Sequence, residues 1–133
     1  LNRISKAGLF LDTLPYNAHT TASDALRMGV PVLTLIGNAF ASRVAASLLN
    51  SVNMPELITT SQDQYESLAI ELALNSEKLD GIKKKLIKNV ETSPLFDSET
   101  FTNNLELAFE EMYRRNKSQL KPDHIVVRDL MGT

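Results

Sequence analysis

The 133-residue chain contains no cysteine, no tryptophan and no long hydrophobic run. Without cysteine it can form neither disulfides nor cysteine-ligated metal sites. No apolar segment approaches the roughly 20 residues that a membrane-spanning helix needs, and none has the form of a signal peptide. The net charge is −2, whereas a nucleic-acid-binding surface needs a strong basic excess. We therefore expect neither a membrane nor a nucleic acid as partner, and a cytoplasmic location.

The first sixty residues alternate short apolar runs with helical patterns. We predict strands near residues 8–11, 31–36 and 56–59, the first two of them buried, and helices over residues 20–28 and 39–49. In the second of these helices, Phe40, Val44 and Leu48 lie on one apolar stripe. A strand–helix–strand–helix–strand order is typical of a parallel sheet flanked by helices. The predicted fold class is therefore α/β, with residues 1–60 forming a βαβαβ unit.

The second half of the chain is helical by its pattern. Ser61 and Gln64 have the spacing of a capping box, and apolar residues follow at helical intervals to about residue 116. Residues 117–133 have no periodicity, so we expect an extended tail. Three parallel strands make only half of a doubly wound sheet and leave one edge bare. We therefore expect more chain upstream of residue 1, or a partner that covers this edge.

The stretch from Asp12 to Leu26 is the most informative for function, because it leads from a strand end into a helix start. Ligands of open α/β sheets bind in the crevice at that position. The first amides of a helix offer free donors, and the helix dipole adds partial positive charge. His19, Thr20 and Thr21 add imidazole and hydroxyl groups at the same point. This combination predicts a phosphate or diphosphate site.

Each of these residues also has a simpler structural interpretation. Thr20 or Thr21 can cap the helix, and Thr21 with Asp24 resembles a capping box. His19 can be a solvated loop residue. Arg43 could reach a phosphate, although a surface or structural ion pair is the more ordinary role for it.

Residues 12–49 read DTLPYNAHTTASDALRMGVPVLTLIGNAFASRVAASLL. This run resembles the C-terminal catalytic region of the O-linked N-acetylglucosamine transferase and SPINDLY family. The similarity continues through residues 55–58, Tyr65 and residues 93–97 to residues 121–124, and so covers nearly the whole chain. It implies the C-terminal Rossmann-like half of a two-lobed, GT-B type glycosyltransferase. Residues 61–116 would then be the helical part of the nucleotide-sugar-binding lobe.

The resemblance also assigns residues. The family's His-Thr-Thr motif contacts the donor diphosphate, which maps to His19, Thr20 and Thr21. The aspartate three residues further on lies at the ribose hydroxyls, which maps to Asp24. No catalytic base can be named, and no metal or other cofactor is implied. Many relatives carry tryptophan where this chain has Arg27, which indicates that this position is at least partly exposed here.

By resemblance, the parent protein carries tetratricopeptide repeats and transfers N-acetylglucosamine from UDP-N-acetylglucosamine to serine or threonine. The protein or peptide acceptor would bind through parts of the enzyme outside this chain, so we expect residues 1–133 alone to transfer no sugar. One alternative is a transferase with another donor, such as GDP-fucose. A second alternative is a non-catalytic binding module that retains the fold.

Overall fold

A computed structural model describes residues 3–127 of the protein, and the chain divides into two compact units, residues 1–96 and residues 97–133. The elements of the first unit, with η denoting a 3-10 helix, are η1 (Ile4–Lys6), β1 (Phe10–Leu11), α1 (Thr20–Arg27), β2 (Val32–Leu35), η2 (Phe40–Ser42), α2 (Val44–Ser51), η3 (Pro55–Leu57), β3 (Ile58–Thr59), α3 (Gln62–Leu74), α4 (Ser76–Thr92) and η4 (Pro94–Phe96). The second unit contains α5 (Ser98–Lys117).

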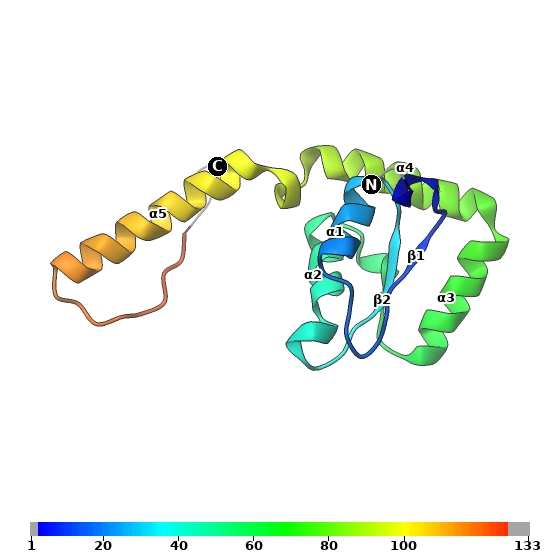
Figure 1. Cartoon of the computed structure of the whole chain (residues 1–133), viewed down its shortest axis with the longest axis horizontal. Coiled ribbons are helices and arrows are strands. Elements are labelled where there is room, and N and C mark those ends of the chain that lie inside the picture. Colours follow the sequence, from blue (N-terminus) through cyan, green and yellow to red (C-terminus); the bar gives the residue numbers. More distant parts are fainter. Residues whose placement is uncertain (1–2, 128–133) are drawn as a thin grey trace. The chain divides into compact units, whose positions relative to one another are not determined.

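The three strands form one parallel sheet in the order β1-β2-β3. Phe10 pairs with Val32 across the first strand pair, and Thr34 pairs with Ile58 across the second. α1 and α2 lie on one side of the sheet and α3 on the other (Figure 1). The predicted α/β fold, a parallel sheet flanked by helices, is confirmed.

α1 ends where the local sequence dictates. The Gly29 amide donates to the Leu26 carbonyl at 3.0 Å, and the Val30 amide donates to the Ala25 carbonyl at 2.9 Å. These two bonds make a Schellman motif, which needs a residue in the left-handed region, and Gly29 has φ of 74°. Pro31 then prevents the helix from continuing. The predicted helix over residues 20–28 is confirmed to within one residue.

The first predicted strand is not buried as expected. β1 is an edge strand of only two residues, and the Leu11 side chain is 53% exposed. The apolar run was a correct signal for a strand, but it did not reveal that the strand lies at the edge of the sheet or that the Leu11 side chain is uncovered. β2, in the middle of the sheet, is mostly buried as predicted.

Two further predicted boundaries are wrong. The helix expected from residue 39 is a 3-10 turn, η2, followed by α2, and Phe40 is 81% exposed instead of packing with the stripe of α2. The turn is held apart from α2 because the Gly37 amide bonds back to the Ser42 carbonyl at 2.9 Å. The third strand begins at Ile58 and not at residue 56, because Pro55 opens η3.

The start of α3 has the predicted cap with one difference. The Ser61 hydroxyl accepts from the Gln64 amide at 3.2 Å, as a capping box requires. The Gln64 side chain, however, accepts from the amide and the hydroxyl of Thr60, one residue before the expected partner.

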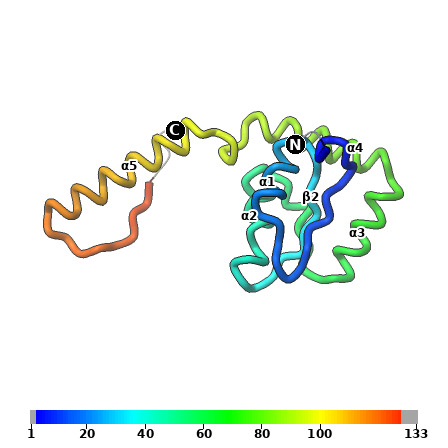
Figure 2. Tube along the Cα trace, in the orientation of Figure 1, coloured from blue at the N-terminus to red at the C-terminus, as the bar shows by residue number. Residues whose placement is uncertain are grey.

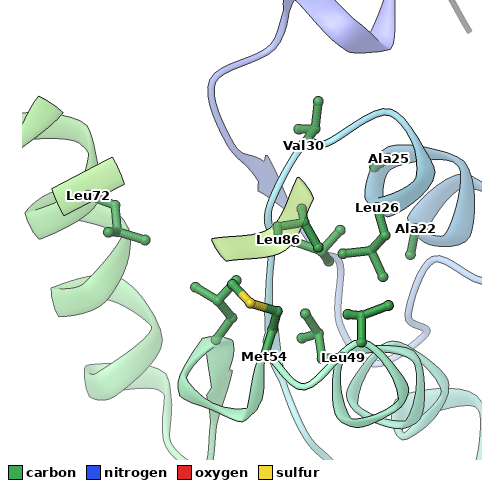
Figure 3. Packing of buried hydrophobic residues seen from close by; sticks show 11 residues of the cluster. Ala22, Ala25, Leu26, Val30, Leu49, Met54, Leu72 and Leu86 are labelled. Atoms are coloured by element: carbon green, nitrogen blue, oxygen red, sulfur yellow. The ribbon is translucent and has the colours of Figure 1, made fainter. Parts of the chain in front are cut away.

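The core of the first unit joins all the helices to the sheet. Figure 3 shows Leu26 of α1, Leu49 of α2 and Leu86 of α4 converging, and each of these side chains is fully buried. α4 runs past the ends of the strands where they begin, as the tube in Figure 2 shows. The Asn89 side chain on α4 accordingly bonds to the Val52 carbonyl ahead of β3 at 2.9 Å. At the opposite, carboxyl ends of β1 and β2 lie the loops that lead to the next helices.

The second unit consists of α5 and the segment after it. The Asp97 carboxylate caps α5 by accepting from the Thr100 amide and hydroxyl, and the amide bond in particular lowers the pKa of Asp97. Several apolar side chains of α5 are exposed, including Phe101 and Phe109. No helix within residues 3–127 is long and apolar enough to cross a bilayer. The predicted domain boundaries stay a prediction, and residues 128–133 of the predicted tail lie outside the described residues.

Candidate functional site

Two loops meet where β1 and β2 end. Residues 12–19 connect β1 to α1, and residues 36–43 connect β2 to α2. The Asn17 amide donates to the Ala41 carbonyl at 2.9 Å and joins the two loops directly. A Cβ atom on Gly37 would collide with the Ser42 side chain, so the second loop closes tightly only with glycine at that position. In parallel sheets this end of the strands is where ligands bind.

α1 begins at this meeting point, one residue earlier than a threonine cap requires. Its N-cap is His19, which makes no side-chain capping bond within the described residues. Thr20 and Thr21 are therefore the first two helical residues, and both are exposed. The expectations that a threonine caps α1, and that Thr21 and Asp24 form a capping box, are wrong, because both residues lie inside the helix. The threonine hydroxyls thus stand beside first-turn amides that have no intrahelical acceptor.

The His19 ring lies between two aromatic side chains, one from each side of the site. The Tyr16 ring stacks on it with centroids 4.9 Å apart and an interplanar angle of 19°. The Phe40 ring meets it edge-on, with centroids 6.1 Å apart and an angle of 90°. The Nε2 atom of His19 is buried and has no hydrogen-bond partner in the described part of the chain. A buried nitrogen without a partner is costly, which makes His19 an unusual residue at this helix start.

Asp24 lies one helical turn after Thr20, so their side chains share a face of α1. Its side chain is half-buried. The structure therefore brings the four residues predicted from the sequence into one helix start: His19 at the cap, Thr20 and Thr21 in the first turn, and Asp24 in the second. Whether they bind a donor stays a prediction.

Asp12 supports the loop that carries His19, and sequence reasoning missed this role. One carboxylate oxygen accepts from the Thr13 amide at 2.9 Å and from the Ala18 amide at 2.7 Å. The other accepts from the Thr34 hydroxyl on β2 at 2.6 Å. Asp12 is only 6% exposed. The signal available in the sequence was a carboxylate directly after an apolar run, with a threonine in the middle of the next one.

Tyr65 extends this network to α3. Its hydroxyl donates to the Asp12 carbonyl oxygen at 2.9 Å. Burial, and secondly the negative charge of Asp12, raise the pKa of the Tyr65 hydroxyl. The hydroxyl therefore stays a donor through the neutral range, and the end of β1 is tied to both β2 and α3.

Two arginines flagged in the sequence have structural contacts of their own. Arg43 donates from Nη1 to the Gly37 carbonyl at 2.9 Å and so braces the loop after β2. No ion pair of Arg43 occurs within residues 3–127, so the expected ion-pair role is replaced by this bond. Arg27 is exposed, as inferred, and its guanidinium lies 5.9 Å from the centroid of the Phe96 ring. Among the described residues, no three histidine, aspartate or glutamate side chains gather as a metal site.

Known proteins resemble this chain in sequence and in fold. The model of glycosyl transferase family 41 matches residues 1–105. One relative is the barley (Hordeum vulgare) protein described as a probable UDP-N-acetylglucosamine–peptide N-acetylglucosaminyltransferase SPINDLY. The two sequences are 40% identical over 105 residues, and this match covers 79% of this chain and 11% of the relative. The Arabidopsis thaliana protein of the same description, SEC, is 38% identical over 128 residues, or 96% of this chain and 13% of the relative.

A solved structure shows the same fold. A mutant of the Thermobaculum terrenum O-GlcNAc transferase superposes with a TM-score of 0.76 at 34% identity, over 85% of this chain and 22% of that one. The chain thus spans about a tenth of the curated relatives it matches. The α/β unit corresponds to part of a GT-B glycosyltransferase, as the sequence predicted. On these grounds the chain belongs to glycosyl transferase family 41.

Proposed function

We propose that this chain is the C-terminal donor-binding part of a protein O-glycosyltransferase that transfers N-acetylglucosamine from UDP-N-acetylglucosamine to serine or threonine. The relatives described as UDP-N-acetylglucosamine–peptide N-acetylglucosaminyltransferases support the reaction. The observation that carries the donor role is the start of α1. There, free amides, two exposed threonine residues and a buried imidazole nitrogen with no partner among residues 3–127 lie within three residues.

In this proposal the chain acts on the leaving group. An acceptor hydroxyl attacks the anomeric carbon of the sugar, the bond from that carbon to the diphosphate breaks, and UDP departs with the added negative charge. His19, Thr20 and Thr21 would donate hydrogen bonds to the diphosphate, and the dipole of α1 would stabilise the same charge. Asp24, one turn along, would accept hydrogen bonds from the ribose hydroxyls. The base that accepts the acceptor proton would come from the rest of the enzyme.

We further propose that the reaction needs no metal ion, because the helix start and its side chains supply donors for the diphosphate. The corresponding test is that a metal chelator leaves the transfer rate of the full-length enzyme unchanged. A cytoplasmic location belongs to the same proposal, since a chain without cysteine suits a reducing compartment.

The test uses the full-length enzyme with UDP-N-acetylglucosamine and a serine-containing acceptor peptide. We expect His19→Ala to lower kcat about a hundredfold to a thousandfold, which is the usual loss for one transition-state donor. His124→Ala removes the only other histidine of the chain and is the matched control, expected to keep the wild-type rate. A His19→Ala enzyme with unchanged kcat and donor affinity would end the proposal.

Asp24→Asn separates ribose binding from a structural role. We expect weaker binding of UDP-N-acetylglucosamine with an unchanged melting temperature. An unchanged dissociation constant would remove Asp24 from the site. Transfer from GDP-fucose in place of UDP-N-acetylglucosamine would retain the diphosphate site and replace the donor.

A further inference from the structure

We propose that Tyr16 is a positioning residue for the donor site: it holds the His19 imidazole in the plane from which that ring meets the diphosphate. The inference rests on the proposed function of His19. The Tyr16 and His19 rings stack nearly parallel, with their centroids 4.9 Å apart and an interplanar angle of 19°. Stacked aromatic rings at such separations attract each other beyond the contribution of buried area alone.

The stack has a clear place in the loop. The Tyr16 carbonyl accepts a hydrogen bond from the Thr13 hydroxyl at 2.7 Å, and the next residue, Asn17, is bonded to Ala41 in the facing loop. The backbone at Tyr16 is therefore held by one bond within its own loop and, through Asn17, by one bond to the facing loop. Its side chain is nevertheless 63% exposed, so it adds little to the core. The contact that the structure does give this ring is the face of His19.

His19 needs such a contact because hydrogen bonding does not orient its Nε2 side. Functional histidines are commonly held by a bond from one ring nitrogen to a carboxylate or carbonyl, which fixes ring and tautomer together. Here Nε2 is buried with no partner within the described residues. Packing must then set the plane, with Tyr16 on the ring face and Phe40 at 90° from the other loop. Rotation of the imidazole would break both aromatic contacts.

Substitutions of Tyr16 should therefore differ in their effect on kcat. In the full-length enzyme, Tyr16→Ala frees the His19 ring and is expected to lower kcat about tenfold to a hundredfold, the usual effect of misplacing a catalytic group, with a smaller change in the donor KM. Tyr16→Phe keeps the stack and should retain most of kcat. Tyr113→Ala is the matched control, because Tyr113 on α5 is equally exposed, at 65%, and is outside both loops. A melting temperature for each variant excludes unfolding as the cause.

A double-mutant cycle decides whether Tyr16 acts through His19. We expect Tyr16→Ala to lower kcat in the wild-type background and to have almost no further effect in His19→Ala. If both variants lower kcat and their effects multiply in full, Tyr16 acts independently of His19 and the inference is overturned. If His19→Ala lowers kcat but Tyr16→Ala does not, the inference fails while the proposed function stands. If His19→Ala itself has wild-type kcat and donor affinity, the proposed function fails.

Discussion

Removing the Asp12 carboxylate should loosen the loop that carries His19. Asp12→Ala takes away three acceptor contacts at once, from the amides of Thr13 and Ala18 and from the Thr34 hydroxyl. Hydrogen bonds to a charged group contribute about 1.5–3 kcal/mol each. Water can replace part of the two amide contacts, which are only part-buried, so we expect a loss of about 3–5 kcal/mol of local stability.

Two variants grade this effect. Asp12→Asn keeps one oxygen for the two amides and loses the charge, and we expect a loss of about 1–2 kcal/mol. Thr34→Val removes only the buried hydroxyl of similar shape, and we expect a loss of the same order. Asp12→Ala should therefore be clearly less stable than Asp12→Asn and Thr34→Val.

Amide hydrogen exchange of the full-length protein measures this loss of local stability within the loop. The Ala18 amide should exchange about a hundredfold faster or more in Asp12→Ala, since each 1.4 kcal/mol of lost local stability is a factor of about ten. Peptides from α4 should keep their wild-type rates, because local opening need not unfold the whole unit. Transfer activity should fall together with loop protection. Wild-type exchange at Ala18 in Asp12→Ala would show that the carboxylate does not hold the loop, and would refute this reasoning.

Two other predictions concern stability. Gly29→Ala should lower the free energy of unfolding by about 1–2 kcal/mol, because Gly29 has φ of 74° and an added Cβ would lie 3.1 Å from Ile87. Urea unfolding measures this loss, and an unchanged midpoint would contradict the prediction. Tyr65 has a folded pKa above its ordinary value of 10.0, so its contribution is complete below pH 10 and is lost as pH rises through the folded pKa. Tyr65→Phe should therefore be less stable near neutral pH and lose less stability in alkali, which unfolding curves across pH can check; equal alkaline losses in both proteins would contradict it.

Local signals explain what the sequence predicted well. The sequence predicts the end of α1 correctly because Gly29 and Pro31 end a helix by their own backbone properties, whatever surrounds them. His19, Thr20 and Thr21 are predicted as a candidate site because they are three consecutive polar residues at a strand-to-helix turn, and the structure places them together at the start of α1. The family resemblance then supplied the fold of the larger enzyme, which no pattern within the chain contains.

Contacts between distant parts of the chain explain what was missed. Asp12 meets Thr34, 22 residues away, and Tyr65, 53 residues away, so no local pattern could reveal the network. Phe40 fits a helical stripe by spacing, but a bond between Gly37 and Ser42 holds it in a separate turn beside His19. The exposure of Leu11 depends on what packs against its face of the sheet, which is set by the tertiary structure and not by the residue itself.

We propose that the donor diphosphate lies at the first turn of α1. A crystal structure of the full-length enzyme with UDP bound measures this position. We predict diphosphate oxygens within about 3 Å of donors from Thr20 and Thr21, with the His19 ring held against Tyr16 and also within hydrogen-bonding distance. A diphosphate bound elsewhere, with the start of α1 facing only solvent, would contradict the claim.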